Sequence, residues 1–179
     1  MRPQLINFWG IGVKTKFMNR VAYFHGKESK LPSSKVDFMI ELGWDVGCIE
    51  MDYSTHFAYA KADAFISEFS PQLLVGSSLG GLVSIYLGTN YNIPMVLLNP
   101  ALKSSEYGIG LPPEFGKFRP MCFALIGEND DVVNPILSII ALSELNCRIS
   151  FGDHGHRTPL EVFNKYIFEI SEQLSSIIN

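Results

Sequence analysis

Short apolar runs alternate with amphipathic segments along almost the whole chain, and this alternation restricts the folds that it can adopt. Six such runs, each typical of a buried strand, lie at 21–25, 45–51, 72–77, 93–99, 121–127 and 147–151. Parallel strands need long crossovers, usually helices, and they become apolar on both faces because the helices cover both. The pattern predicts an α/β fold: a three-layer sandwich with a mainly parallel sheet of about six strands flanked by helices.

Length and composition fit one domain. The chain has 179 residues, of which 47% are hydrophobic and 18% charged, so it is expected to fold around a substantial core. Residues 1–17 fit no periodic pattern, and we expect them to form an N-terminal extension or an edge strand. We expect the domain proper to span 18–179.

Several functional classes are disfavoured by the sequence. The net charge is −4 and no Lys/Arg cluster occurs, so nucleic acid is not an expected partner. The apolar runs are shorter than the ~18 residues that span a bilayer, and the N-terminus lacks a signal-peptide core. Cys48, Cys122 and Cys147 form no CxxC pair and are expected to be buried free thiols. These features predict a cytoplasmic protein without a membrane span.

Polar residues follow four of the predicted strands, and in a parallel sheet these positions share one edge. His25-Gly26-Lys27 follows the first strand, and Ser78 follows the strand at 72–77. An acidic pair follows 121–127, and a loop with two histidines follows 147–151. A hydroxyl, a carboxylate and an imidazole therefore reach the same edge, in the chain order Ser, Asp, His.

The segment Gly76-Ser77-Ser78-Leu79-Gly80 matches G-x-S-x-G between a buried strand and a helix. This context is typical of a nucleophile elbow, in which a sharp turn exposes the serine hydroxyl. Gly76 and Gly80 would make room for the turn, Ser78 would be the nucleophile, and the Leu79 amide would face the developing oxyanion. A plain structural turn is the alternative. The cluster lacks G-x-G-x-x-G and a following Gly-Lys-Ser/Thr, so neither a dinucleotide nor a P-loop phosphate is expected.

Two residues compete for each remaining role. His154 directly follows the last strand and is favoured as the general base, with His156 as the competitor. Asp130 is nearer its strand end than Asp131 and is favoured as the acid that orients the imidazole.

The loop after the first strand is expected to give the second oxyanion donor. The Lys27 amide fits that role, because Gly26 lets the backbone approach, and His25 is expected to brace the loop. A simple turn at His25-Gly26 is the alternative.

At these residues the sequence resembles the α/β-hydrolase superfamily, in particular the small bacterial YqiA-like esterases. The resemblance rests on VAYFHGKESK, LLVGSSLGGLVSIYLGTNYNIPMVLLNPALK, GENDDVVNP and GDHGH, and its most specific part runs from the elbow to Asn99-Pro100-Ala101. It implies a compact hydrolase with little or no lid and a triad of Ser78, Asp130 and His154.

The expected function is hydrolysis of carboxylic esters or thioesters through an acyl-enzyme. The connection at 100–120 is too short for a large helical cap, which favours short acyl chains. The alternatives are a catalytically silent binding protein with this fold and a serine peptidase. No cofactor is expected, and a metal on Asp153, His154 and His156 is disfavoured. The sequence does not indicate an oligomeric state.

Overall fold

The structure is a computed structural model that describes residues 20–31, 33–55, 57–102 and 120–178. Its strands are β1 (Arg20–Phe24), β2 (Asp45–Cys48), β3 (Leu73–Ser77), β4 (Met95–Leu98), β5 (Cys122–Gly127) and β6 (Arg148–Gly152). Its helices are α1 (Ser34–Glu41), α2 (Ala58–Phe69), α3 (Leu79–Tyr91), α4 (Pro135–Glu144) and α5 (Leu160–Ile178).

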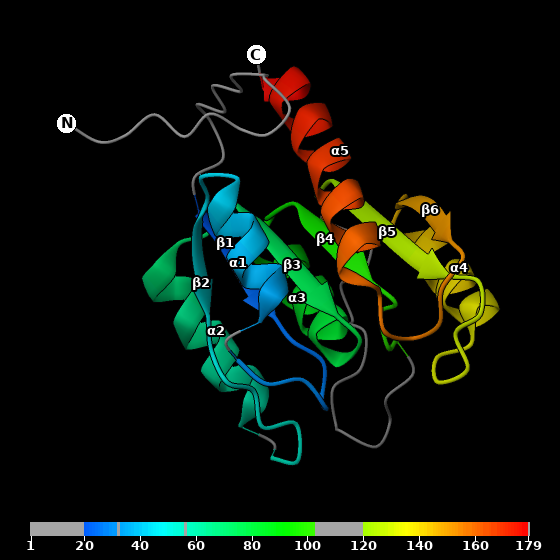
Figure 1. Cartoon of the computed structure of the whole chain (residues 1–179). Coiled ribbons are helices and arrows are strands. Elements are labelled where there is room, and N and C mark those ends of the chain that lie inside the picture. Colours follow the sequence, from blue (N-terminus) through cyan, green and yellow to red (C-terminus); the bar gives the residue numbers. More distant parts are fainter. Residues whose placement is uncertain (1–19, 32, 56, 103–119, 179) are drawn as a thin grey trace.

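The strands form one six-stranded sheet in the order β2-β1-β3-β4-β5-β6, and every neighbouring pair is parallel (Figure 1). The chain runs from β1 to β2 on one side, and then returns past β1 to continue through β3 to β6 on the other. The strand order therefore reverses between β1 and β3. In open α/β sheets, ligands bind outside the carboxyl ends of the strands at such a switch point.

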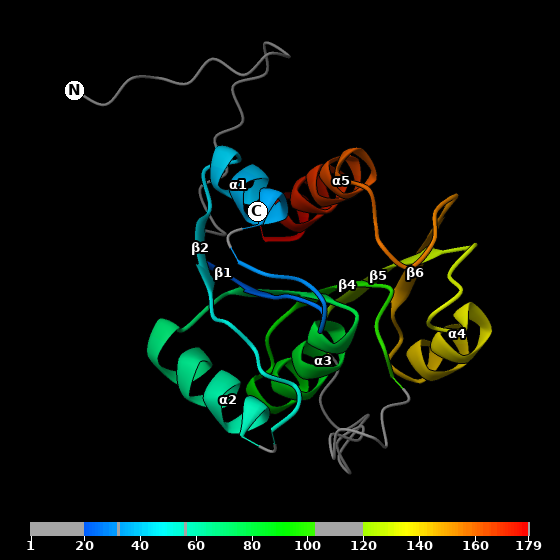
Figure 2. The same ribbon diagram turned by 60° about the horizontal axis from the view of Figure 1, so that its bottom comes forward.

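Helices cover both faces of the sheet, which completes the predicted three-layer sandwich. Helices α1 and α5 lie together on one face, and α2, α3 and α4 lie on the other (Figure 2). One buried cluster fills the layer under α1 and α5, and a second fills the layer under the other three helices. The α/β prediction and the strand count are confirmed.

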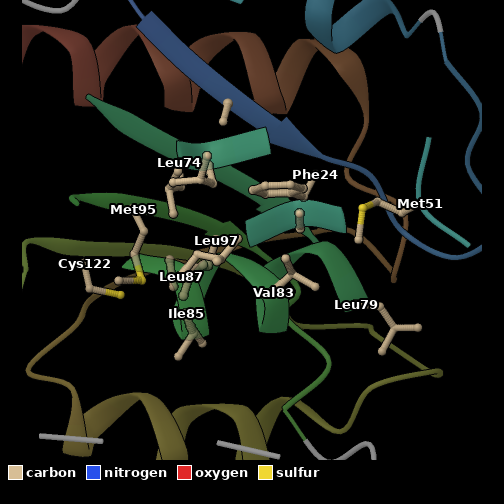
Figure 3. Packing of buried hydrophobic residues seen from close by; sticks show 14 of the residues in the cluster. Phe24, Met51, Leu74, Leu79, Val83, Ile85, Leu87, Met95, Leu97 and Cys122 are labelled. Carbon is tan, nitrogen blue, oxygen red and sulfur yellow. The ribbon is translucent and has the colours of Figure 1, made fainter. Parts of the chain in front are cut away.

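Helix α3 is the central helix of the second layer and is buried on almost every side. Its residues Leu82, Val83, Ile85 and Leu87 have no exposed surface, and each such side chain contributes roughly 1.5–3 kcal/mol of hydrophobic stabilisation. Figure 3 shows this helix against the strands, with sticks on Phe24, Met51, Leu74, Leu79, Val83, Ile85, Leu87, Met95, Leu97 and Cys122. The N-terminus of α3 is therefore fixed relative to β1, β3 and β4.

The structure departs from the sequence expectations at a few points. The strand expected at 45–51 ends at Cys48, and further along the same segment the Met51 amide donates to the His25 ring. The three cysteines are free thiols, but only Cys122 is buried. In the part of the chain that the structure describes, no helix has both the length and the apolarity to cross a bilayer. Residues 1–19 and 103–119 lie outside the described residues, so the expected extension and most of the 100–120 connection remain predictions.

Candidate active site

Ser78 occupies a backbone conformation that side chains rarely adopt. Its φ is 55° and its ψ is −118°, at the junction between β3 and α3. A non-glycine residue in such a region costs about 1–3 kcal/mol and persists only where its surroundings enforce it. The surroundings here include three backbone hydrogen bonds: the Ser78 amide donates to Leu98 O at 2.9 Å, and Ser78 O accepts from the Gly81 amide at 2.9 Å and from the Ala101 amide at 3.0 Å. The turn has the geometry expected of a nucleophile elbow.

The glycines around Ser78 stand where the chain has no room for a side chain. A Cβ on Gly76 would overlap Gly80 O and the Ser84 hydroxyl, and a Cβ on Gly80 would overlap Phe24 O at the end of β1. Gly76 and Gly80 therefore let the helix start lie directly against two strand ends. This is the space-clearing role that the G-x-S-x-G pattern predicts for them.

His156 is the histidine that contacts Ser78. Its Nε2 lies 2.9 Å from Ser78 Oγ, and its Nδ1 lies 2.8 Å from Asp130 Oδ2. An ionised carboxylate only accepts, so Nδ1 carries the proton and Nε2 presents its lone pair to the serine hydroxyl. Ser78, His156 and Asp130 thus form one continuous hydrogen-bonded chain.

His154, which the sequence pattern favoured, is not brought to Ser78. Its side chain is buried, and its Nδ1 donates to Gly155 O at 2.7 Å. A Cβ on Gly152 would lie 2.7 Å from its ring, and a Cβ on Gly127 would lie equally close, so the ring fills space that these two glycines leave at the strand ends. The His154 amide also bonds back to Gly152 O at 2.8 Å, which turns the chain sharply after β6. Because of this turn, the second histidine of the loop reaches the elbow.

Of the two acidic candidates, Asp130 lies against the imidazole and Asp131 is exposed to solvent. The Asp130 side chain is 2% exposed, and its Oδ1 accepts from the Val132 and Val133 amides at 2.9 and 2.8 Å. These two bonds hold Oδ1, which leaves Oδ2 to face His156. A buried carboxylate with every oxygen hydrogen-bonded is well suited to fix the imidazole tautomer.

The loop after β1 packs directly on Ser78. A Cβ on Gly26 would lie 3.1 Å from Ser78 Cβ, so only glycine allows this approach without displacement. Gly26 O accepts from His25 Nδ1 at 2.7 Å and from the Ser29 amide at 3.1 Å. The carbonyl and the following amide lie on opposite edges of a trans peptide, so these bonds direct the Lys27 amide away from His25.

His25 braces this loop, as expected from the sequence. Its ring is buried, its Nε2 accepts from the Met51 amide at 3.0 Å, and Tyr53 Oη donates to its carbonyl oxygen at 2.5 Å. The Nε2 contact requires a lone pair, so the proton is on Nδ1. This tautomer is the one that can donate to Gly26 O.

Asn99 is a residue of the site that the sequence reasoning quoted but did not use. It directly follows β4, has a positive φ of 44° and is 1% exposed. Its side-chain amide hydrogen-bonds to backbone atoms of the β5 end and of the histidine loop. The sequence signal that could have identified it was an asparagine in the Asn-Pro-Ala segment at the end of a predicted strand.

Across the described ranges, no group of three or more His, Cys, Asp and Glu side chains is placed to hold a metal ion.

Solved structures with the same architecture come from several bacteria. The B. subtilis ydeN gene product is 13% identical, with a TM-score of 0.72 over 88% of this chain and 99% of that chain. A putative α/β-superfamily hydrolase from Xanthomonas campestris is 16% identical, with a TM-score of 0.69 over 87% and 98%. Est1E from Butyrivibrio proteoclasticus is 14% identical, with a TM-score of 0.67 over 90% and 87%. At these identities the similarity establishes the fold.

Sequence comparison identifies the family. No curated protein matches the chain. The model of an uncharacterised protein family, UPF0227, matches residues 21–110, which is just over half of the 179 residues. The match runs from β1 through the Ser78 elbow and past the turn at Asn99. The chain therefore belongs to the uncharacterised family UPF0227, and it shares its fold with the α/β-superfamily hydrolase from Xanthomonas campestris.

Proposed function

We propose that this protein is a serine hydrolase that cleaves carboxylic esters or thioesters of short acyl chains through an acyl-enzyme. The observation that carries the proposal is the continuous contact from Ser78 Oγ to His156 and on to Asp130, at 2.9 and 2.8 Å, beside a strained elbow. The nucleophile is Ser78, the general base is His156 in place of the expected His154, and the orienting acid is Asp130.

In the acylation step, Ser78 Oγ attacks the carbonyl carbon of the substrate while His156 Nε2 takes the hydroxyl proton. The carbonyl π electrons move to oxygen and form a tetrahedral oxyanion. Collapse of this intermediate breaks the bond to the leaving group, and the imidazolium returns the proton to the departing alcohol or thiol. Asp130 stabilises the imidazolium through its hydrogen bond to Nδ1 and keeps its own charge.

In the deacylation step, a water molecule takes the place of the leaving group. His156 removes a proton from this water as the oxygen attacks the acyl carbon, and the second tetrahedral intermediate expels Ser78 Oγ. The proton on Nε2 returns to the serine, and the carboxylic acid leaves. The free enzyme is restored without any net change in protonation of the triad.

The oxyanion is held by backbone amides in this proposal. The Leu79 amide is in the first turn of α3, where helix amides have no acceptor within the helix and carry the positive end of the helix dipole. The Lys27 amide is the second donor, and the contact of Gly26 with Ser78 supports it. Removing one donor of this kind typically costs about 10²–10³ in kcat.

The substrate class is inferred from the chain length of one connection and from the similar structures. The segment between β4 and β5, residues 99–121, has 23 residues, which is short for a separate helical cap. A site without a large cap would favour short acyl groups. The names of two similar structures support an ester as the substrate. One is Est1E, and the other is an esterase domain from Rhodothermus marinus, which is 13% identical with a TM-score of 0.66.

The test is steady-state hydrolysis of p-nitrophenyl acetate, butyrate and octanoate, and of acetyl and butyryl thioesters. We expect turnover of the short esters, and Ser78→Ala should lose it by at least about 10³-fold. Ser77→Ala, next in the chain, is the matched control and should retain turnover. Wild-type protein without turnover would favour the silent binding protein, and faster turnover of octanoate than of butyrate would refute the short-chain assignment.

A further inference from the structure

Asn99 makes three side-chain hydrogen bonds, which use both N–H donors of its amide and one acceptor site of its oxygen. Oδ1 accepts from the Gly127 amide at 2.6 Å, and Nδ2 donates to Gly155 O at 3.1 Å and to His156 O at 2.7 Å. The backbone partners decide the orientation of the amide, because an N–H only donates and a carbonyl only accepts. The side chain therefore connects the end of β5 to the loop that carries His156.

The backbone of the same turn holds the nucleophile. Leu98 O accepts from the Ser78 amide at 2.9 Å, and the Ala101 amide donates to Ser78 O at 3.0 Å. The segment 98–101, which begins with the last residue of β4, thus contacts the elbow through its backbone and the histidine loop through the Asn99 side chain. Gly127 also begins the turn to Asp130, whose amide donates to Gly127 O at 3.2 Å. The three triad loops therefore meet at this segment, with Asn99 contacting two of them through its side chain.

The bond from Asn99 Nδ2 to His156 O holds the backbone of the residue whose ring contacts both Ser78 and Asp130. Other contacts hold the loop at earlier residues: His154 O accepts from the Asn129 amide at 3.1 Å, and Asp153 accepts from the Asn129 side chain at 2.7 Å. The imidazole reaches Ser78 and Asp130 at the same time only if its Cα is held in place. A displacement of about 1 Å in such a constellation can reduce a rate by about 10²-fold.

We infer that Asn99 is a positioning residue for the triad, which holds the His156 backbone so that its two ring nitrogens meet Ser78 and Asp130 together. This inference rests on the proposed function. The positive φ of Asn99 is part of the same device, because it turns the side chain from the sheet edge toward the histidine loop.

Two substitutions separate this role from a general contribution to stability. Asn99→Gly accepts the φ of 44° without strain and removes all three side-chain bonds. Asn99→Asp keeps the acceptor for the Gly127 amide but turns an oxygen toward the two loop carbonyls, so it removes the contact to the loop while the β5 contact persists. Asn146, exposed after α4 with a φ of 55°, provides the matched control variants Asn146→Gly and Asn146→Asp.

The kinetic experiment measures kcat and KM with p-nitrophenyl butyrate. We expect both Asn99 variants to lower kcat by about 10–100-fold with KM changed less than about threefold, and both Asn146 variants to leave the two constants unchanged. In a His156→Ala background, Asn99→Gly should change the residual rate less than about twofold, because Asn99 acts through His156. An unchanged kcat, or an equal loss in both backgrounds, would overturn the inference.

A second measurement does not depend on turnover. The low-field proton NMR signal of His156 Nδ1–H, assigned by its loss in His156→Ala, reports the bond to Asp130. We expect both Asn99 variants to shift or broaden this signal and both Asn146 variants to preserve it. A signal identical to wild type in folded Asn99→Asp would refute the positioning role. Absence of esterase turnover in the wild type would instead refute the proposed function, and the NMR result would still decide the role of Asn99.

Discussion

The two histidines of the loop after β6 can be separated by single substitutions. His156→Ala removes the ring that bonds Ser78 and Asp130, and His154→Ala removes the buried ring between Gly127 and Gly152. The two residues are two positions apart in one loop, so each variant controls for the other. We predict that the first abolishes turnover and the second lowers stability.

The magnitude for His156→Ala follows from its contacts. Loss of the general base should lower kcat by at least about 10³-fold, which corresponds to about 4 kcal/mol of transition-state stabilisation. The fold should lose little, because Asp130 Oδ1 keeps its two backbone bonds and the His156 side chain is already 18% exposed. A loss of about 1 kcal/mol in the free energy of unfolding is expected, because water can replace the partly exposed ring at both of its hydrogen-bond partners.

For His154→Ala we expect the opposite result, a larger loss of stability and a smaller loss of turnover. Its ring is buried, so truncation leaves a cavity and loses the bond to Gly155 O, at a cost of about 2 kcal/mol. Its Nε2 has no hydrogen-bond partner within the described residues, so no further bond is lost. Turnover per folded molecule should fall less than about tenfold, or 1.4 kcal/mol.

The assay combines steady-state hydrolysis of p-nitrophenyl acetate with urea unfolding of each variant. The two effects should dissociate: a large loss of kcat with near-native stability for His156→Ala, and reduced stability with retained kcat for His154→Ala. If His154→Ala abolished turnover of folded protein while His156→Ala retained it, the assignment of the base would be wrong.

Three further predictions concern Asp130, Lys27 and the buried Lys35. Asp130→Asn should lower kcat by about 10³–10⁴-fold by favouring the wrong imidazole tautomer, whereas Asp131→Asn should leave it within about twofold in the same ester assay. Lys27→Pro, which removes the backbone amide, should lower the kcat of folded protein by about 10²-fold, and Lys27→Ala should not; equal losses in both would refute the donor. Burial lowers the pKa of Lys35 to about 8, so its charge destabilises the folded state at pH 7, and this cost disappears as pH rises from 8 towards 10.5. Lys35→Met should therefore raise the free energy of unfolding at pH 7 by up to about 3 kcal/mol, with a gain that shrinks over that range; a gain independent of pH in urea titrations would contradict the linkage.

The parallel sheet and the elbow were predictable because local patterns decide them. Continuous apolar runs such as 72–77 require burial on both faces, and G-x-S-x-G between such a run and a helix has few other structural uses. The predicted strand segments agree with the observed strands within a few residues. Where a strand was expected to continue through Met51, its amide instead bonds to His25, a contact between residues distant in sequence.

The choice between His154 and His156 could not be made from the sequence. It depends on the turn closed by the bond from the His154 amide to Gly152 O, and on the space that Gly127 leaves on the neighbouring strand. The turn decides which of two histidines, two residues apart, faces Ser78. The space at Gly127 depends on the pairing of β5 with β6. The contribution of Asn99 was hidden for the same reason, because its three partners lie 28, 56 and 57 residues away in the chain.

Covalent labelling of the elbow tests the central claim most directly. Intact-mass spectrometry after reaction with a fluorophosphonate should show one added phosphonyl group on the wild type and on Ser77→Ala, and none on Ser78→Ala. The relay through His156 predicts that His156→Ala labels at least about 10²-fold more slowly. A wild-type protein that remains unlabelled, or a Ser78→Ala variant that labels like the wild type, would contradict the account.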